Sequence, residues 1–180
     1  SSDDWPLLEK VSEVNLPTVI STGGLTTEEI DKLVSFSEHR RIDLSLMHCV
    51  SIYPMTHNKS NLLNIRMIKE RYPNIKVGWS THESPDDSSI VMIAKALGAE
   101  IFERHIGLPA DNITLNKYSS TPKQIDKWLD SLVFAQSALG NYKRVIDSDE
   151  LESLNELKRG IYLKKPINVG SKIEKRDIYY

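Results

Sequence analysis

The chain has 180 residues, of which 39% are hydrophobic and 27% charged, a balance that allows a buried core and excludes an intrinsically disordered protein. The net charge is −2 with scattered basic residues, so the composition does not favour a nucleic-acid partner. With Cys49 as the only cysteine and no apolar run near the roughly 18–20 residues of a membrane span, we expect no disulfide framework, no membrane partner and a reducing, cytoplasmic compartment.

Short apolar runs recur at nearly even spacing and predict strands that are buried on both faces, as in a parallel sheet. These runs are residues 17–22, 44–50, 75–80 and 100–106. A segment with helical periodicity follows each run. The predicted helices lie within residues 26–40, 60–72, 84–98 and 121–140. The first begins with threonine and two acidic residues, and the last two end in glycine, which are typical helix start and stop signals.

The alternation of strands and helices predicts the fold class, which is α/β with parallel strands and right-handed crossovers. Two architectures fit this pattern, a doubly wound open sheet or half of a (β/α)8 TIM barrel. No GxGxxG motif follows any predicted strand, and this favours the barrel. Because four units cannot close a ring of eight, we expect the remaining strands to precede residue 1 or to come from another chain.

The composition changes after Gly140, where a polar and charged segment begins. We predict that residues 1–140 are the C-terminal half of a TIM-barrel domain and that residues 141–159 are a linker with a helical turn or two. Residues 160–180 contain a short strand, a Pro/Gly turn and a second small element. This last segment is too small to fold alone, so we predict that it begins a further domain.

Polar side chains follow the predicted strands at their carboxyl ends, where barrel enzymes place their active sites. His82 and His105 end the third and fourth runs, 23 residues apart. Adjacent strand ends lie about 5 Å apart, so both imidazoles can reach one point. Two imidazoles at one point suit a first-row divalent metal ion. Structural histidines with hydrogen-bonded rings fit the same spacing, and the residues alone leave both interpretations open.

Other candidate residues have simpler interpretations. His48 and Cys49 lie inside the second apolar run, which indicates a hydrogen-bonded core histidine and a small core residue. The hydroxyls at the end of the first run, Ser21 among them, form either a turn or, with nearby backbone N–H groups, an anion site. The remaining histidines outside the strand ends, His39 and His57, are expected at the surface.

Five motifs in order resemble the sialic acid synthase family. They are VISTGGLTTEEI, LMHCVSIYP, VGWSTH, AKALGAEIFERHIGL and KRGIYLKKPINVGSKIEKRDI, and together they cover essentially the whole chain. The resemblance implies a (β/α)8 barrel of which this chain supplies about the last four units, then a linker and the start of a small antifreeze-like (SAF) domain. It also implies a homodimer that condenses phosphoenolpyruvate with N-acetylmannosamine or a related amino sugar.

The resemblance implies roles for individual residues. His82 and His105 match the two catalytic histidines that bind a divalent metal, usually Mn2+ or Mg2+. Ser21 and Ser80 match hydroxyls that hold phosphoenolpyruvate, and Tyr53 matches a tyrosine that contacts the sugar. The family's phosphoenolpyruvate-binding lysines, its early acidic residue and an arginine donated across the dimer would fall outside residues 1–180. We therefore do not expect this chain to catalyse the reaction by itself.

The chain departs from the family pattern at three places near the implied substrates. Ser51 stands in place of an asparagine near phosphoenolpyruvate, and Thr81 in place of the aspartate between the serine and histidine of VGWSTH. Asn116 stands in place of an aspartate that contacts the sugar, in a loop that lacks the family's glycine and proline. These departures imply a different acceptor from N-acetylmannosamine.

The implied reaction is a metal-assisted condensation in which C3 of phosphoenolpyruvate attacks the acceptor's aldehyde, water adds at C2 and phosphate leaves by C–O cleavage. Two alternatives remain. One is a catalytically inactive relative that keeps the scaffold to bind a sugar or a partner chain. The other is a different phosphoenolpyruvate-dependent ulosonic acid synthase, although such enzymes usually lack the antifreeze-like domain.

Overall fold

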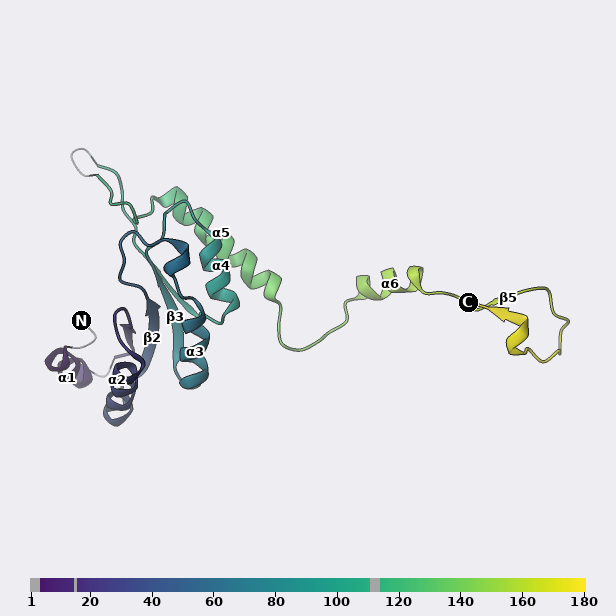
Figure 1. Cartoon of the computed structure of the whole chain (residues 1–180), viewed down its shortest axis with the longest axis horizontal. Helices are drawn as coiled ribbons and strands as arrows, with labels where there is room; N and C mark the ends of the chain where they lie inside the picture. Colours follow the sequence, from purple (N-terminus) through teal and green to yellow (C-terminus); the bar gives the residue numbers. More distant parts are fainter. Residues whose placement is uncertain (1–3, 15, 111–113) are drawn as a thin grey trace. The chain divides into compact units, whose positions relative to one another are not determined.

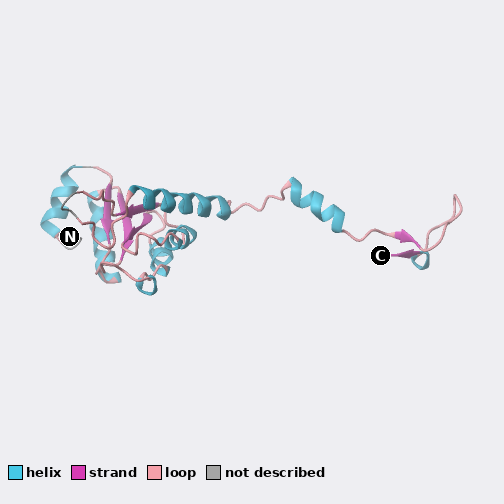
Figure 2. Ribbon diagram, turned by 90° about the horizontal axis from the view of Figure 1, so that it is seen from above, coloured by secondary structure: helices cyan, strands magenta, loops and turns pink. Residues whose placement is uncertain are grey.

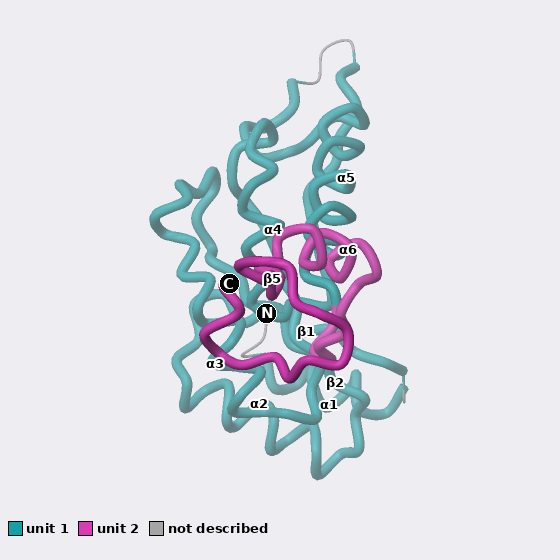
Figure 3. The backbone as a smooth tube through the Cα atoms, turned by 90° about the vertical axis from the view of Figure 1, so that its right-hand side faces the viewer, with its two compact units in different colours: residues 1–140 teal, residues 141–180 magenta. Residues whose placement is uncertain are grey.

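The computed structural model of the chain describes residues 4–14, 16–110 and 114–180 (Figure 1). The chain forms two compact units, residues 1–140 and residues 141–180, which are coloured separately in Figure 3. In the described part of the chain, no helix is both long and apolar enough to cross a membrane.

The first unit is built on a sheet of four parallel strands that lie side by side in chain order (Figure 2). They are β1 (Thr18–Ser21), β2 (Leu44–Cys49), β3 (Lys76–Thr81) and β4 (Ile101–Arg104). The predicted parallel order is confirmed. A doubly wound sheet reverses its strand order at a switch point, and no reversal occurs among these four strands. The arrangement is an α/β half-barrel, consistent with part of a TIM barrel.

Helices connect these strands and flank them in the sequence. They are α1 (Trp5–Val14), α2 (Thr27–Arg40), α3 (Leu63–Arg71), α4 (Ser89–Ala96) and α5 (Pro122–Leu139), and a 3-10 turn, His57–Lys59, precedes α3. Thr26 caps α2 in a reciprocal box with Glu29, and Thr121 forms the same box with Gln124 ahead of Pro122. The sequence analysis did not identify α1, although the Asp4 side chain accepts a hydrogen bond from the N–H of Leu7, as a helix cap does.

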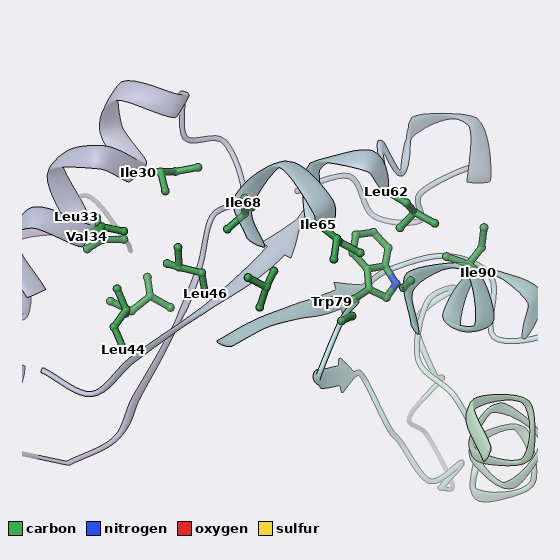
Figure 4. Packing of buried hydrophobic residues seen from close by; sticks show 14 of the residues in the cluster. Ile30, Leu33, Val34, Leu44, Leu46, Leu62, Ile65, Ile68, Trp79 and Ile90 are labelled. Atoms are coloured by element: carbon green, nitrogen blue, oxygen red, sulfur yellow. The ribbon is translucent and has the colours of Figure 1, made fainter. Parts of the chain in front are cut away.

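The apolar core lies between one face of the sheet and the helices that follow the strands (Figure 4). Leu46, Val77 and Trp79 supply its strand side, and all three are fully buried. The helix side comes from α2, α3 and α4, and its buried members include Ile30, Leu33, Val34, Ile65, Ile68 and Ile90. Removing this apolar surface from water is the main source of stability for the unit.

The opposite face of the sheet, called the inner face below, carries small and polar side chains. Residues opposite each other across parallel strands point to the same face, so Ser21, Met47 and Gly78 share it, as do Cys49 and Ser80. At Gly78 an added Cβ would lie 2.5 Å from the carbonyl oxygen of Ile101, so a side chain does not fit between these strands. The apolar core packs on the other face of the sheet.

The second unit contains α6 (Ser148–Leu157) and an antiparallel pair of two short strands, β5 (Tyr162–Leu163) and β6 (Ile178–Tyr179), preceded by a 3-10 turn at Lys175–Asp177. Tyr162 and Tyr179 stack across this pair with ring centroids 5.5 Å apart. The expected strand and second small element are both present. The segment expected to be a linker with a turn or two contains a ten-residue helix, because Asp147 caps it and acidic residues occupy its first turn.

Two substitutions on α3 test the position of the core. Ile65 is 0% exposed and Leu63, two residues earlier, is 71% exposed. We expect Ile65→Ala to lower the free energy of unfolding by about 2–5 kcal/mol, because it removes buried methyl groups and leaves a cavity. The control Leu63→Ala is expected to change it by less than about 0.5 kcal/mol. Urea denaturation measures both values, and equal losses would contradict the described face of α3.

Candidate active site

His82 and His105 lie side by side at the carboxyl end of the sheet. Thr81 pairs with Arg104 in the parallel register, and each histidine is the next residue along its chain. The two imidazole ring centroids are 5.2 Å apart, with 47° between the ring planes. The His82 side chain is buried and that of His105 is exposed. The structure thus brings together the two histidines that the sequence pattern singled out.

The hydrogen bonds of His82 fix the orientation of its ring. Its Nδ1 lies 3.1 Å from the carbonyl oxygen of Val50, and its own carbonyl accepts a 2.9 Å hydrogen bond from the backbone N–H of Met55. A carbonyl only accepts, so Nδ1 donates and Nε2 keeps its lone pair in the neutral ring. This tautomer leaves Nε2 free to bind a metal ion, with a backbone carbonyl holding the other nitrogen.

Two tyrosines complete a cluster of four rings, called the ring cluster below: Tyr53, His82, His105 and Tyr118. The Tyr53 ring lies 4.2 Å from His82, the Tyr118 ring lies 5.0 Å from His105, and the two tyrosine rings are 5.2 Å apart. Tyr53 follows β2, and Tyr118 belongs to the segment between β4 and α5. The sequence analysis missed Tyr118, whose only signal was its place two residues after Asn116.

A cleft of about 430 Å³ opens beside Tyr53, between α1 and the β1 edge of the sheet. Its lining includes Ser21, Gly23, Cys49 and Ser51. Three of the residues predicted to bind substrate, Ser21, Ser51 and Tyr53, therefore share one cavity, and all three are exposed. A concave site with a few converging hydroxyls is the usual form of a small-molecule pocket.

Ser80 lies on the inner face of the sheet and is buried. It is the register partner of Cys49, which lines the cleft, and its hydroxyl donates a 3.1 Å hydrogen bond to the Glu103 carboxylate. Ser80 therefore already has a polar partner on the protein. A substrate that used its hydroxyl would compete with Glu103 or share it.

Asn116 lies in the turn that leads to Tyr118. Its side chain is exposed, and its Oδ1 accepts a 3.2 Å hydrogen bond from the backbone N–H of Tyr118. Asn116 is thus connected to the ring cluster through Tyr118 and is not a member of it. Residues 111–113 of the same predicted loop lie outside the described residues.

The simpler interpretations of the other histidines and of Cys49 are confirmed. His48 is buried, and its Nε2 lies 2.8 Å from the carbonyl oxygen of Ser60. Cys49 is buried, and His39 and His57 are exposed. Burial lowers the pKa of His48 below its ordinary value of 6.5, since a charged imidazole is poorly solvated there.

A buried ion pair lies directly behind the two histidines. Arg104 Nη1 is 2.8 Å from Glu83 Oε1, and both side chains are only 2% exposed. Burial raises the pKa of the Glu83 carboxyl, and the facing guanidinium opposes that shift. The neighbouring Thr81 is also buried, and its hydroxyl has no hydrogen-bond partner within the described residues. The sequence analysis did not identify the Glu83–Arg104 pair.

Few side chains at this site could act as ligands to a metal ion. Among residues 4–14, 16–110 and 114–180, no three His, Cys, Asp or Glu side chains form a group that could hold a metal ion. The two imidazoles fit a divalent ion as a pair of nitrogen ligands, with the free Nε2 of His82 as one of them. The remaining coordination positions would be available to water or substrate oxygens.

Comparison with known proteins decides the family. The NeuB family profile matches residues 1–144. This chain belongs to the NeuB family. N-acetylneuraminate-9-phosphate synthase of Drosophila melanogaster is 30% identical to it, over 98% of this chain and 54% of that protein. Pseudaminic acid synthase of Campylobacter jejuni is 28% identical, over 98% of this chain and 51% of that protein.

Solved structures agree with this assignment. The crystal structure described as spore coat polysaccharide biosynthesis protein E of Chromobacterium violaceum superimposes with a TM-score of 0.87 at 38% identity. The match covers 99% of this chain and 54% of that one. The NeuB-family chain thus spans about half the length of the relatives it matches. The resemblance to sialic acid synthases drawn from the five motifs is confirmed.

The lowered pKa of His48 predicts a pH dependence of stability. The unfolded chain takes up a proton near pH 6.5 while folded His48 resists it, so this contribution is complete above that pH and declines below it. His48→Gln keeps a donor for the Ser60 carbonyl and removes the titration. We expect the variant's urea midpoint to fall less than that of the wild type between about pH 8 and about pH 5. If the urea midpoints of the two proteins changed equally with pH, the assignment of this pH dependence to His48 would be contradicted.

Proposed function

We propose that this chain is part of an enzyme that condenses phosphoenolpyruvate with a hexose or amino sugar to form a nonulosonic acid. The observation that carries the proposal is the His82–His105 pair at the carboxyl end of a parallel sheet, beside a cleft lined by Ser21, Ser51 and Tyr53. Membership of the NeuB family supports it, since the named relatives include N-acetylneuraminate-9-phosphate and pseudaminic acid synthases.

His82 and His105 are the residues that would hold a divalent cation, Mn2+ or Mg2+. When bound, the ion would act as a Lewis acid that polarises the aldehyde oxygen of the acceptor sugar. The Val50 carbonyl keeps the His82 proton on Nδ1 and so keeps its Nε2 free. The exposed face of His105 leaves room for water and substrate oxygens beside the pair.

The hydroxyl groups of the inner face would bind phosphoenolpyruvate, with Ser21, Ser51 and Ser80 as donors to its phosphate and carboxylate oxygens. Bound there, its C3 forms the new bond to the aldehyde carbon while a water oxygen adds at C2. The C2–O bond to phosphate then breaks, and inorganic phosphate leaves with that oxygen. Holding two reactants and water in one geometry supplies much of the rate acceleration in such a reaction.

Tyr53 and Asn116 would contact the acceptor sugar. Tyr53 lies between the cleft and the ring cluster, so a sugar that contacts it also reaches the two histidines. The Tyr118 ring packs edge-on against His105 and would help to exclude bulk water from the reacting groups.

We further propose that residues 1–140 form the last four units of a (β/α)8 barrel, that residues 141–159 are a linker and that residues 160–180 begin an antifreeze-like (SAF) domain. The match to about half of each relative supports a longer protein. The open edges of β1 and β4 support this too, because unpaired strand edges are prone to aggregation. We propose that the intact protein is a cytoplasmic homodimer.

The metal role is tested in the protein with its barrel complete. We expect His82→Ala and His105→Ala each to lower Mn2+-stimulated phosphate release from phosphoenolpyruvate by more than about 100-fold, because a Lewis acid supplies several kcal/mol. The control His39→Ala, at an exposed position on α2, should keep full activity. Full activity in excess chelator would remove the metal role. A folded wild type that binds the sugar without any turnover would indicate the inactive, sugar-binding relative instead.

The acceptor is tested separately. Asn116 and Ser51 lack the carboxylate and amide of the family pattern, and losing a charge-assisted hydrogen bond costs about 1.5–3 kcal/mol, or roughly 10- to 100-fold. We expect poor use of N-acetylmannosamine and preference for another hexose in a panel assayed by phosphate release. Asn116→Asp should raise the use of N-acetylmannosamine, and Asn74→Asp, an exposed control ahead of β3, should not. Strong preference of the wild type for N-acetylmannosamine would refute the argument.

A further inference from the structure

The Glu83–Arg104 ion pair occupies positions that are tied to both histidines of the site. Glu83 directly follows His82, and Arg104 directly precedes His105. The two charged groups meet at 2.8 Å and are almost completely buried. Since side chains alternate along a strand, Arg104 points away from the inner face that carries His105. The pair therefore points away from the inner face and is connected to the two histidines through the backbone.

Arg104 makes more contacts than the ion pair alone. Its Nη2 donates to the carbonyl oxygen of Ser84 at 3.0 Å, and its Nε donates to the Ser120 hydroxyl at 2.6 Å. The guanidinium carbon also lies 5.8 Å from the centre of the Trp128 ring, on α5. A guanidinium is planar with donors at fixed angles, so these partners set its position and it sets theirs.

Ser120 extends this network to the rest of the ring cluster. Its backbone N–H donates to the carbonyl oxygen of His105 at 2.9 Å, and its own carbonyl accepts from Gly107 at 3.0 Å. Ser120 lies two residues after Tyr118, whose ring packs on His105. Arg104 thus joins three segments, those that carry His82, His105 and Tyr118.

We propose that Arg104, with Glu83 as its counter-ion, is a positioning residue that holds His82 and His105 at the separation needed for metal binding. This inference rests on the metal role proposed above for the two histidines. A buried ion pair is a weak source of stability compared with apolar side chains of similar size. Its position at both strand ends is explained by the geometry it imposes on the adjoining histidines.

The test uses the protein with its barrel complete and the double variant Glu83→Gln/Arg104→Met, which leaves no uncompensated buried charge and is expected to fold. The matched control breaks another ion pair, Asp31–Arg71, in which Arg71 Nε and Nη2 contact the carboxylate at 2.8 and 2.6 Å between α2 and α3. The control variant is Asp31→Asn/Arg71→Gln. Circular dichroism establishes that each protein is folded, and Mn2+ binding is measured by electron paramagnetic resonance.

A second measurement needs no metal. Imidazole resonances of His82, His105 and the exposed His39 are recorded by NMR in metal-free protein. We expect the double variant to raise the Kd for Mn2+ by about tenfold or more, as when outer supports of metal ligands are removed. It should shift the resonances of His82 and His105 and leave His39 unchanged. The control variant should change the Kd by less than about twofold, because it is distant from the site.

The outcomes separate the two proposals. A folded double variant with unchanged Mn2+ affinity and unchanged imidazole resonances would overturn the positioning role of Arg104. A folded double variant that loses affinity together with shifted His82 and His105 resonances would support it. If the wild type binds no Mn2+, the proposed metal role of the two histidines is refuted. The imidazole resonances of His82 and His105 then decide the positioning role by themselves. A shift in the double variant would support that role, and unchanged resonances would refute it.

Discussion

The parallel pairing of β3 with β4 is the constraint on which the candidate site depends. It sets Thr81 opposite Arg104, and this register makes His82 and His105 neighbours at the same edge and on the same face. A slip of one residue would turn one histidine toward the helices, because successive side chains alternate between faces. The apolar partners Val77 and Trp79 hold the register, since the same slip would expose them to water.

The sheet divides stability and chemistry between its two faces. The face toward the helices carries the fully buried Leu46, Val77 and Trp79, and the inner face carries hydroxyls and the imidazoles. Charged groups on the core side have to be paired, as Glu83 and Arg104 are. This division means that a substitution on the inner face need not disturb the packing of the apolar core.

The departures of this chain from its family fall on both sides of the sheet. Ser51 lines the cleft, and Asn116 belongs to the turn before Tyr118. Thr81 instead lies on the buried core side, opposite Arg104 in the register, and its hydroxyl has no hydrogen-bond partner within the described residues. The Arg104 guanidinium pairs with the carboxylate of Glu83, which lies two residues after Thr81 in the sequence. The buried guanidinium behind the histidines is therefore paired with a carboxylate.

The sequence by itself determined the strand order, the core role of His48 and the pairing of His82 with His105, because short apolar runs and strand ends are local patterns. It also determined the family, through five motifs in order along the chain. Only the tertiary structure decided which groups surround that pair. Tyr118 reaches His105 through the path of a loop, and Glu83, which follows β3, pairs with Arg104 at a separation of 21 residues in the sequence. Neither contact has a periodic signal, since both arise where separate segments converge. Helix α1 was overlooked although its sequence carries helical signals, namely the Asp4 cap and apolar residues on one side of the helix.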